Sequence, residues 1–259
     1  MEYAVFITKH DHLKYCGRNF SRLYYGNEFC PRLLPAPAEL AAVLDFARPL
    51  DFTLVTPYLT DPELDRLRPL LEMVADTRPE SEVVCNDWGV FQVLREDYPT
   101  LTPVMGRLLN KMKRGPRLAP VMDRLPAASL EYFRSSNLSV PLFRRFLRDN
   151  GVRRAEFDNV LQGIDFSFDD MALSLYLPFA YVTTTRACLV NACDQPEKRD
   201  VIGIFPCRRE CQRYTFYLQN QVMPVALVRQ GNTLFFKNEA LPPELGPVDR
   251  LVIEPEIPM

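Results

Sequence analysis

Short apolar runs alternate along the chain with segments of helical periodicity. Residues 3–8 (YAVFIT) and 82–85 (EVVC) are short, mostly apolar runs of the kind that form buried strands. Residues 38–47, in contrast, carry their apolar side chains at the three- and four-residue spacing of one helix face. Strands that alternate with helices in this way favour βαβ units and a parallel sheet.

The pattern predicts an α/β fold with a single TIM-like (β/α)8 barrel, in which some helices are short or incomplete. The barrel is expected to occupy residues 1–212. Residues 213–259, with a hairpin turn at Gly231-Asn232, are expected to form a small C-terminal β extension packed on the barrel. The predicted barrel strands are residues 3–8, 21–26, 52–58, 82–85, 101–105, 130–135, 153–157 and 173–182. Helices are predicted at residues 38–47, after a cap at Asp61, and at 90–94 and 140–147.

Composition narrows the classes of partner. The chain has 259 residues, 47% of them apolar and 25% charged, which is typical of a globular domain. The net charge of −2 does not favour nucleic acid as a partner, although residues 107–117 form one basic segment. The N-terminus has no signal-peptide pattern and no run of 18 apolar residues occurs. We therefore expect a cytoplasmic protein that does not bind membranes.

Four of the seven cysteines, Cys188, Cys193, Cys207 and Cys211, fall within 24 residues. In a chain without secretory features, such a density favours a soft-metal or iron–sulfur site over disulfides. The spacing is neither that of a standard zinc finger nor that of a ferredoxin. The alternative is that these are reduced thiols packed in the core as small apolar groups.

The barrel layout adds a fifth cysteine to this set. Chemistry in such barrels sits at the C-terminal ends of the strands. Cys30 follows the second predicted strand and Cys188 follows the eighth, so only the first strand would separate them in a closed barrel. We expect Cys30 to join Cys188, Cys207 and Cys211 around one cluster, which leaves Cys193 as the alternate ligand.

Other polar residues also follow predicted strands. An arginine there can bind an anionic donor through its planar fork, and an aspartate can transfer protons. Asp87 has an alternative role as the cap of a helix that begins at Trp88, and Arg186 has one in an ion pair with Asp158 or Glu156. The candidate catalytic residues are Asp87, Arg107 and Asp158, and the candidate substrate-binding residues are Asn86, Asn137, Asn159 and Arg186.

Three motifs resemble a known family. Residues 24–32 (YYGNEFCPR), 84–89 (VCNDWG) and 184–188 (TTRAC), the last followed by a C-x-x-x-C pair, resemble the collagenase-like (U32-type) peptidase family of unassigned mechanism, and within it the UbiV group. The resemblance implies a TIM-like barrel and a 4Fe-4S cluster. It also implies oxygen-independent hydroxylation of a ubiquinone precursor or an RNA base, with prephenate as a small anionic hydroxyl donor. The implied cluster ligands are Cys30, Cys188, Cys207 and Cys211.

The resemblance further implies a heterodimer with a paralogous family member, in which this chain either catalyses the reaction itself or supports its partner. The sequence departs from the UbiV group in the length of the loop between Cys188 and Cys207 and in the added Cys193. Another member of the family draws its ligands from a tighter C-terminal group, which would favour Cys193 over Cys30. Two other functions stay open: a peptidase, as the family name suggests, and a non-catalytic scaffold that binds a paralogue.

Overall fold

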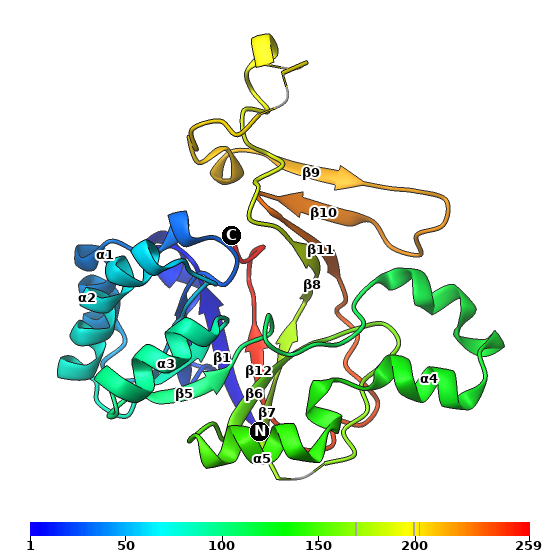
Figure 1. Ribbon diagram of the computed structural model, residues 1–259, viewed down its shortest axis with the longest axis horizontal. Helices are drawn as coiled ribbons and strands as arrows, with labels where there is room; N and C mark the ends of the chain where they lie inside the picture. Colours follow the sequence, from blue (N-terminus) through cyan, green and yellow to red (C-terminus); the bar gives the residue numbers. More distant parts are fainter. Residues whose placement is uncertain (169, 199, 202) are drawn as a thin grey trace.

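Eight parallel strands form a closed barrel in the computed structural model, which describes residues 1–168, 170–198, 200–201 and 203–259 (Figure 1). This confirms the predicted TIM-like architecture. Helices connect several of the strands and lie outside the barrel (Figure 1). In chain order the barrel strands are β1 (Glu2–Ile7), β2 (Arg22–Gly26), β3 (Asp51–Val55), β4 (Glu82–Cys85), β5 (Thr102–Met105), β6 (Arg154–Asp158), β7 (Ala172–Leu177) and β12 (Val248–Ile253).

The barrel is closed by its most C-terminal strand. β12 lies between β1 and β7 and pairs in parallel with both, with Arg250 opposite Glu2 and Ile253 opposite Leu177. The predicted boundary, a barrel of residues 1–212 with 213–259 as an appendage, is therefore wrong. Residues 213–259 supply both the closing strand and most of a second sheet.

The predicted strand at residues 173–182 is in fact two strands, β7 and β8 (Phe179–Thr184), on either side of Pro178. Proline has no backbone N–H to donate to a strand ladder, so a continuous barrel strand across it is disfavoured. β8 leaves the barrel and joins an antiparallel sheet of order β8-β11-β10-β9. The other strands of this sheet are β9 (Thr215–Leu218), β10 (Leu227–Gln230) and β11 (Thr233–Lys237), and the predicted Gly231-Asn232 turn joins the last two.

The helices are α1 (Pro37–Phe46), α2 (Asp61–Thr77), α3 (Trp88–Asp97), α4 (Ala127–Arg134) and α5 (Pro141–Asp149). The predicted strand at residues 130–135 is wrong, because residues 130–134 belong to α4. Short runs of leucine and aromatic residues do not distinguish strand from helix, and the preceding Ala127 and Ala128 favour helix. α2 is capped by Thr60 instead of Asp61, and Thr60 N–H donates to Glu63 at 2.8 Å.

The barrel interior is packed with side chains. Phe6, Tyr24 and Tyr176 meet edge to face inside it, with ring centroids 6.0–6.5 Å apart. At the N-terminal end of the strands, Arg250 pairs with Glu2 at 2.6 Å and with Glu82 at 2.5 Å. Because both features fill the lumen, ligands have access to the rim of the barrel and not to a channel through it.

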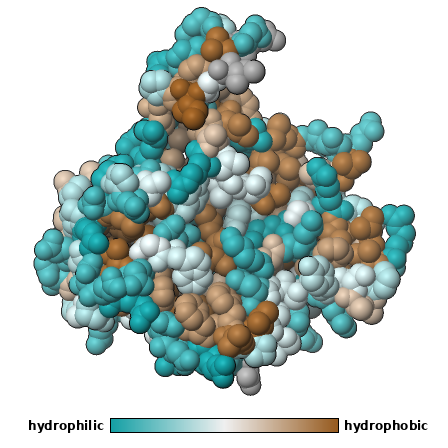
Figure 2. Space-filling model, in the orientation of Figure 1, coloured by the Kyte–Doolittle hydropathy of each residue, from teal (hydrophilic) through white to brown (hydrophobic). Residues whose placement is uncertain are grey.

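The second sheet stands beside the C-terminal ends of the barrel strands, and residues 188–198 rise above it (Figure 1). Figure 2 shows apolar side chains gathered over this sheet and over the segment above it. Phe216, Tyr217 and Leu218 of the edge strand β9 are all exposed. Within the part of the chain that the structure describes, no helix is long and apolar enough to cross a bilayer.

Candidate functional site

Four cysteines line one cavity of about 340 Å³ between the barrel rim and the second sheet. They are the predicted ligands Cys30, Cys188, Cys207 and Cys211, and we call this space the cysteine cavity. Cys30 follows β2, Cys188 follows β8, and the other two precede β9. Cys211 is 6% exposed and the other three are half-buried. Cys193 is exposed and is not among the residues that line the cavity.

The thiols of the cysteine cavity influence one another. Burial raises the pKa of Cys30 to about 11, and the nearby sulfurs of Cys211, Cys207 and Cys188 add to the rise. Burial also raises the pKa of Cys188 and of Cys211. These three thiols therefore carry protons at neutral pH in the metal-free chain, and a metal that binds them must release those protons.

Asn232, in the turn between β10 and β11, joins the segments that carry the cysteines. Its side chain is buried and reaches from the second sheet to the loop after β2 and to the segment after β8. Its nitrogen lies within hydrogen-bonding distance of three oxygens: Phe29 O at 2.6 Å, Tyr58 Oη at 3.0 Å and Thr185 O at 2.7 Å. The side chain thus fixes Cys30 and Cys188 relative to each other through their neighbours.

Glu210 holds the two halves of the cysteine-rich segment together. Its carboxylate is 2% exposed and accepts from the backbone N–H of Ala192 at 3.0 Å and of Arg208 at 3.1 Å. Between the paired cysteines, Arg209 adopts a left-handed backbone (φ 56°), and its N–H donates to the sulfur of Cys207 at 3.4 Å. The C-x-x-x-C pair is therefore set by a folded turn and not by an open loop.

Gly231 allows the hairpin turn to approach Cys211. Its φ is 59°, and a Cβ added to it would lie 3.1 Å from the Cβ of Cys211 and 2.5 Å from the terminal methyl of Met259. A larger residue would be strained by this backbone conformation and would also push against the cysteine.

The donor set of the cysteine cavity fits a polynuclear cluster. Among the described residues, no group of three or more His, Cys, Asp or Glu side chains is arranged to hold a single metal ion. Four sulfurs around one cavity, contributed by three separate segments, match the ligand type and number of a 4Fe-4S centre.

Arg107, predicted to be catalytic, is fully buried at the barrel rim. All five of its N–H groups are used inside the protein, and its guanidinium carbon lies 3.9 Å from the ring centroid of Tyr176. Its partners are Asp158 at 3.0 Å, Glu254 at 2.8 Å, the carbonyl of Phe179 at 3.1 Å, and Glu28. With no free donor, Arg107 holds the rim together and does not face a substrate.

The charges around Arg107 are nearly balanced. Three buried carboxyls, Glu28, Asp158 and Glu254, face two guanidinium groups, because Arg114 also pairs with Asp158 at 2.6 Å. Burial raises the pKa of Glu254 to about 8, against the opposing effect of Arg107. A proton held by Glu254 at neutral pH makes the five groups neutral as a set, which is the low-energy arrangement for buried charges.

Three other predicted residues have structural partners. Asp87 caps α3, accepting from the N–H of Gly89 at 2.6 Å and of Val90 at 3.3 Å, so the alternative role considered for it is the one the structure has. Asn86 is buried, donates to Thr56 O at 3.0 Å and accepts from Leu108 N at 2.9 Å. Asn159 is buried and donates to the carbonyls of Asn238 and Ala240.

Asn137 and Arg186 complete the predicted set. Asn137 donates to Leu109 O and accepts from Lys111 N, both at 3.0 Å. Arg186 is the one predicted substrate-binding residue that lines the cysteine cavity, with a side chain that is 56% exposed. It lies 3.9 Å from Glu63 and over the Tyr58 ring, and so does not form the considered ion pair with Asp158 or Glu156.

Sequence reasoning missed Glu254, Asn232 and Glu210 as residues that build the site. Glu254 directly follows β12, as polar residues follow other barrel strands, but this strand was assigned to the C-terminal extension. Asn232 was seen only as a turn residue. Glu210 lies inside the C-x-x-x-C pair, where a single acidic residue among arginines was the available signal.

Comparisons with known proteins do not assign the chain to a family. The sequence matches no protein-family model and no curated protein. A solved structure described as that of a U32 peptidase aligns with a TM-score of 0.48 and 13% sequence identity, over 99% of this chain and 93% of that chain. At this level the likeness carries no information about catalysis or ligands.

Proposed function

We propose that this chain binds a 4Fe-4S cluster through Cys30, Cys188, Cys207 and Cys211. The observation that carries the proposal is that these four cysteines, from three separate segments, line one cavity while Cys193 does not. Thiols used only as small apolar groups need no such convergence. Cys85, for example, is buried alone in β4.

The cluster, when bound, supplies one-electron chemistry at a potential that its surroundings tune. The chain's own residues hold the four thiolates in place through Asn232 and Glu210, and bring the cation of Arg186 to the edge of the cavity. A cation next to an anionic cluster stabilises its reduced form, which tends to raise the reduction potential.

We extend the proposal to an oxygen-independent hydroxylation system, in which the chain acts as the iron–sulfur subunit beside a paralogous partner. This extension rests on the resemblance of residues 24–32, 84–89 and 184–188 to the UbiV group. The resemblance implies an aromatic or quinone precursor as the acceptor and prephenate as the anionic donor. The position of Arg107 does not support the role considered for a strand-end arginine in binding that donor, because its guanidinium is buried in ion pairs.

A peptidase is less well supported by the geometry. A cysteine nucleophile needs a histidine base within hydrogen-bonding reach. The two histidines of the chain lie elsewhere: His12 is 3.3 Å from Glu256, and His10 faces Asp11. Neither is among the described residues that line the cysteine cavity.

The proposal is tested by purifying the chain without oxygen and recording its electron paramagnetic resonance spectrum after reduction. We expect the signal of a reduced 4Fe-4S centre together with about four irons and four sulfides per chain. A protein that stays colourless and free of iron after reconstitution would contradict the proposed cofactor. Hydroxylation is tested separately, by adding the loaded chain to extracts that lack it and measuring the hydroxylated product without oxygen.

A further inference from the structure

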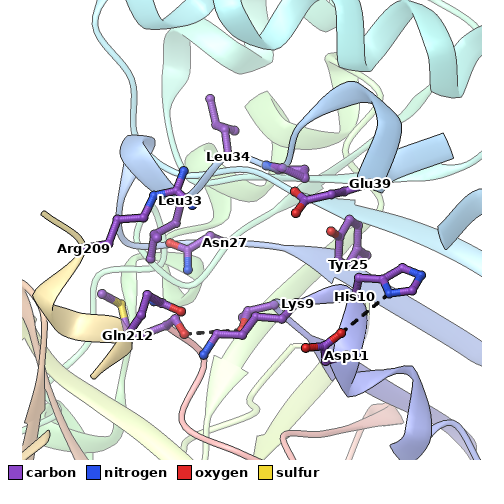
Figure 3. Close-up of a pocket in the computed structure, with 13 residues that line it drawn as sticks. Lys9, His10, Asp11, Tyr25, Asn27, Leu33, Leu34, Glu39, Arg209 and Gln212 are labelled. Carbon is purple, nitrogen blue, oxygen red and sulfur yellow. Dashed lines mark hydrogen bonds and ion pairs between the residues drawn. The ribbon is translucent and has the colours of Figure 1, made fainter. Parts of the chain in front are cut away.

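A second cavity of about 260 Å³ opens at the C-terminal ends of β1 and β2, next to the cysteine cavity (Figure 3). The two cavities share Leu33 and Met259 in their walls. The second one, which we call the β1–β2 cavity, is also lined by Asn27, Lys9 and Arg209. None of these three side chains was assigned to the cysteine site above, where Arg209 acts only through its backbone.

The side-chain amide of Asn27 has a fixed orientation. It is fully buried, and its oxygen accepts from the backbone N–H of Phe29 at 3.0 Å and of Cys30 at 2.8 Å. A flipped amide would turn its own N–H groups toward these two donors. The nitrogen therefore faces away from the Cys30 loop, and it has no hydrogen-bond partner among the described residues. Buried donors without an acceptor are rare, and this one belongs to a residue that lines a cavity.

Charges are separated across the β1–β2 cavity. Arg209 and Asn27 lie on one side of it, Lys9 extends its ammonium group into the middle, and Glu39 and Asp11 lie on the other side (Figure 3). Neither Lys9 nor Arg209 forms an ion pair with any carboxylate of the described residues. Arg209 donates one Nη to Arg32 O at 3.3 Å, so the cationic side offers its remaining guanidinium N–H groups, the Lys9 ammonium and the Asn27 amide as donors.

The lining also carries a group of apolar side chains, Leu33, Leu34, Pro35 and Met259, beside the ring of Tyr25. The geometry points to a binding site for a small organic acid with an aliphatic body and a second polar group. Its carboxylate is bound by Asn27, Lys9 and Arg209, and a hydroxyl or ammonium group next to the carboxylate donates to Glu39.

This site bears on the proposed cluster through Asn27. The oxygen of this side chain holds the backbone at Cys30, and its nitrogen binds the ligand. Ligand binding therefore stiffens the loop that carries one cluster thiolate. This coupling rests on the proposed cluster, whereas binding of the acid does not.

The test uses three acids with the same body: L-leucine carries an ammonium group, L-leucic acid carries a hydroxyl group, and isocaproate carries neither. Binding to the full chain is measured by isothermal titration calorimetry, and iron is measured on the same sample. Leucine or leucic acid is expected to bind about tenfold more tightly than isocaproate, since only they supply a donor to Glu39. Equal affinity for all three acids, or no binding of any, overturns the inference.

The matched variant is Asn27→Asp, which keeps an oxygen acceptor for Phe29 and Cys30 and removes the N–H donor. It is expected to lower the affinity about tenfold or more while the iron content is retained. Lys9→Met is expected to weaken binding in the same way without touching the Cys30 loop, and Lys113→Met, outside the cavity, to leave it unchanged. Unchanged affinity in both Asn27→Asp and Lys9→Met would mean that water alone satisfies the amide, and would refute the site. The affinity for the acids can be measured even if the wild-type chain binds no iron. A failure of the proposed cluster is therefore distinguished from a failure of the acid site.

Discussion

Substitution of Asn232 tests directly how the cysteine cavity is assembled. Its two N–H hydrogens are shared among the oxygens of Phe29, Tyr58 and Thr185, at 2.6, 3.0 and 2.7 Å. The Asn232→Ala substitution therefore removes about two hydrogen bonds and leaves buried oxygens without a donor. With a net contribution of about 1 kcal/mol for each bond, and more for acceptors left unpaired, the expected loss of unfolding free energy is about 2–3 kcal/mol.

Urea unfolding measures this loss, and the iron content after anaerobic reconstitution measures its effect on the cavity. The matched control is Asn238→Ala at the other end of β11, where the side chain donates to Asn159 O at 3.1 Å, away from the cysteines. We expect both variants to be less stable than wild type and only Asn232→Ala to lose iron. Wild-type stability and iron in Asn232→Ala, or equal iron loss in both variants, would refute the reasoning.

The remaining predictions concern two buried charged residues and one turn. Arg107→Met leaves three carboxyls without their shared partner, so the free energy of unfolding measured in urea should fall by about 3–5 kcal/mol. Wild-type stability of this variant would contradict a structural role for Arg107. Glu156→Gln tests pH dependence, because burial raises the pKa of Glu156 to about 7 from its usual value near 4.5. A raised pKa means that the folded state prefers the protonated form, so wild type loses stability as pH rises from about 4.5 through 7, by roughly 3 kcal/mol. The melting temperature of Glu156→Gln relative to wild type should therefore be higher at pH 8 than at pH 5, and an equal difference at both pH values would count against this assignment. Gly231→Ala, which strains a left-handed turn against Cys211, should lower both stability and iron content, with stability measured in urea.

The barrel was predictable because most of its strands are buried on both faces and appear in the sequence as continuous apolar runs. β12 was not predicted as a barrel strand because the whole second sheet separates it from β7 in the chain. It also carries Arg250, whose charge is balanced by Glu2 and Glu82, which are distant in sequence. Pro178 was a visible signal that β7 ends, but the apolar residues on both sides of it concealed the break.

The convergence of the four cysteines was predicted, although by a route that the structure changes. β2 and β7 are separated by both β1 and β12, not by β1 alone. Cys188 nevertheless reaches the cavity that Cys30 lines, because β8 leaves the barrel and carries the chain across its rim.

The roles of the polar rim residues were not predictable in the same way. Strand-end positions correctly indicated that Arg107 and Asp158 lie at one rim. Whether such a residue faces a substrate or an internal partner depends on side chains far away in the sequence. For Arg107 the deciding partner is Glu254, on the strand that closes the barrel.

Iron and acid-labile sulfide in Cys30→Ala and Cys193→Ala, reconstituted side by side without oxygen, test the central claim most directly. Cys30 lines the cysteine cavity and Cys193 does not, although Cys193 is much closer in sequence to the other three cysteines. We expect Cys30→Ala to lose the cluster and Cys193→Ala to retain about four irons per chain, as wild type does. A cluster that survives Cys30→Ala and is lost in Cys193→Ala would contradict the four-cysteine cavity and favour a site built within residues 188–211.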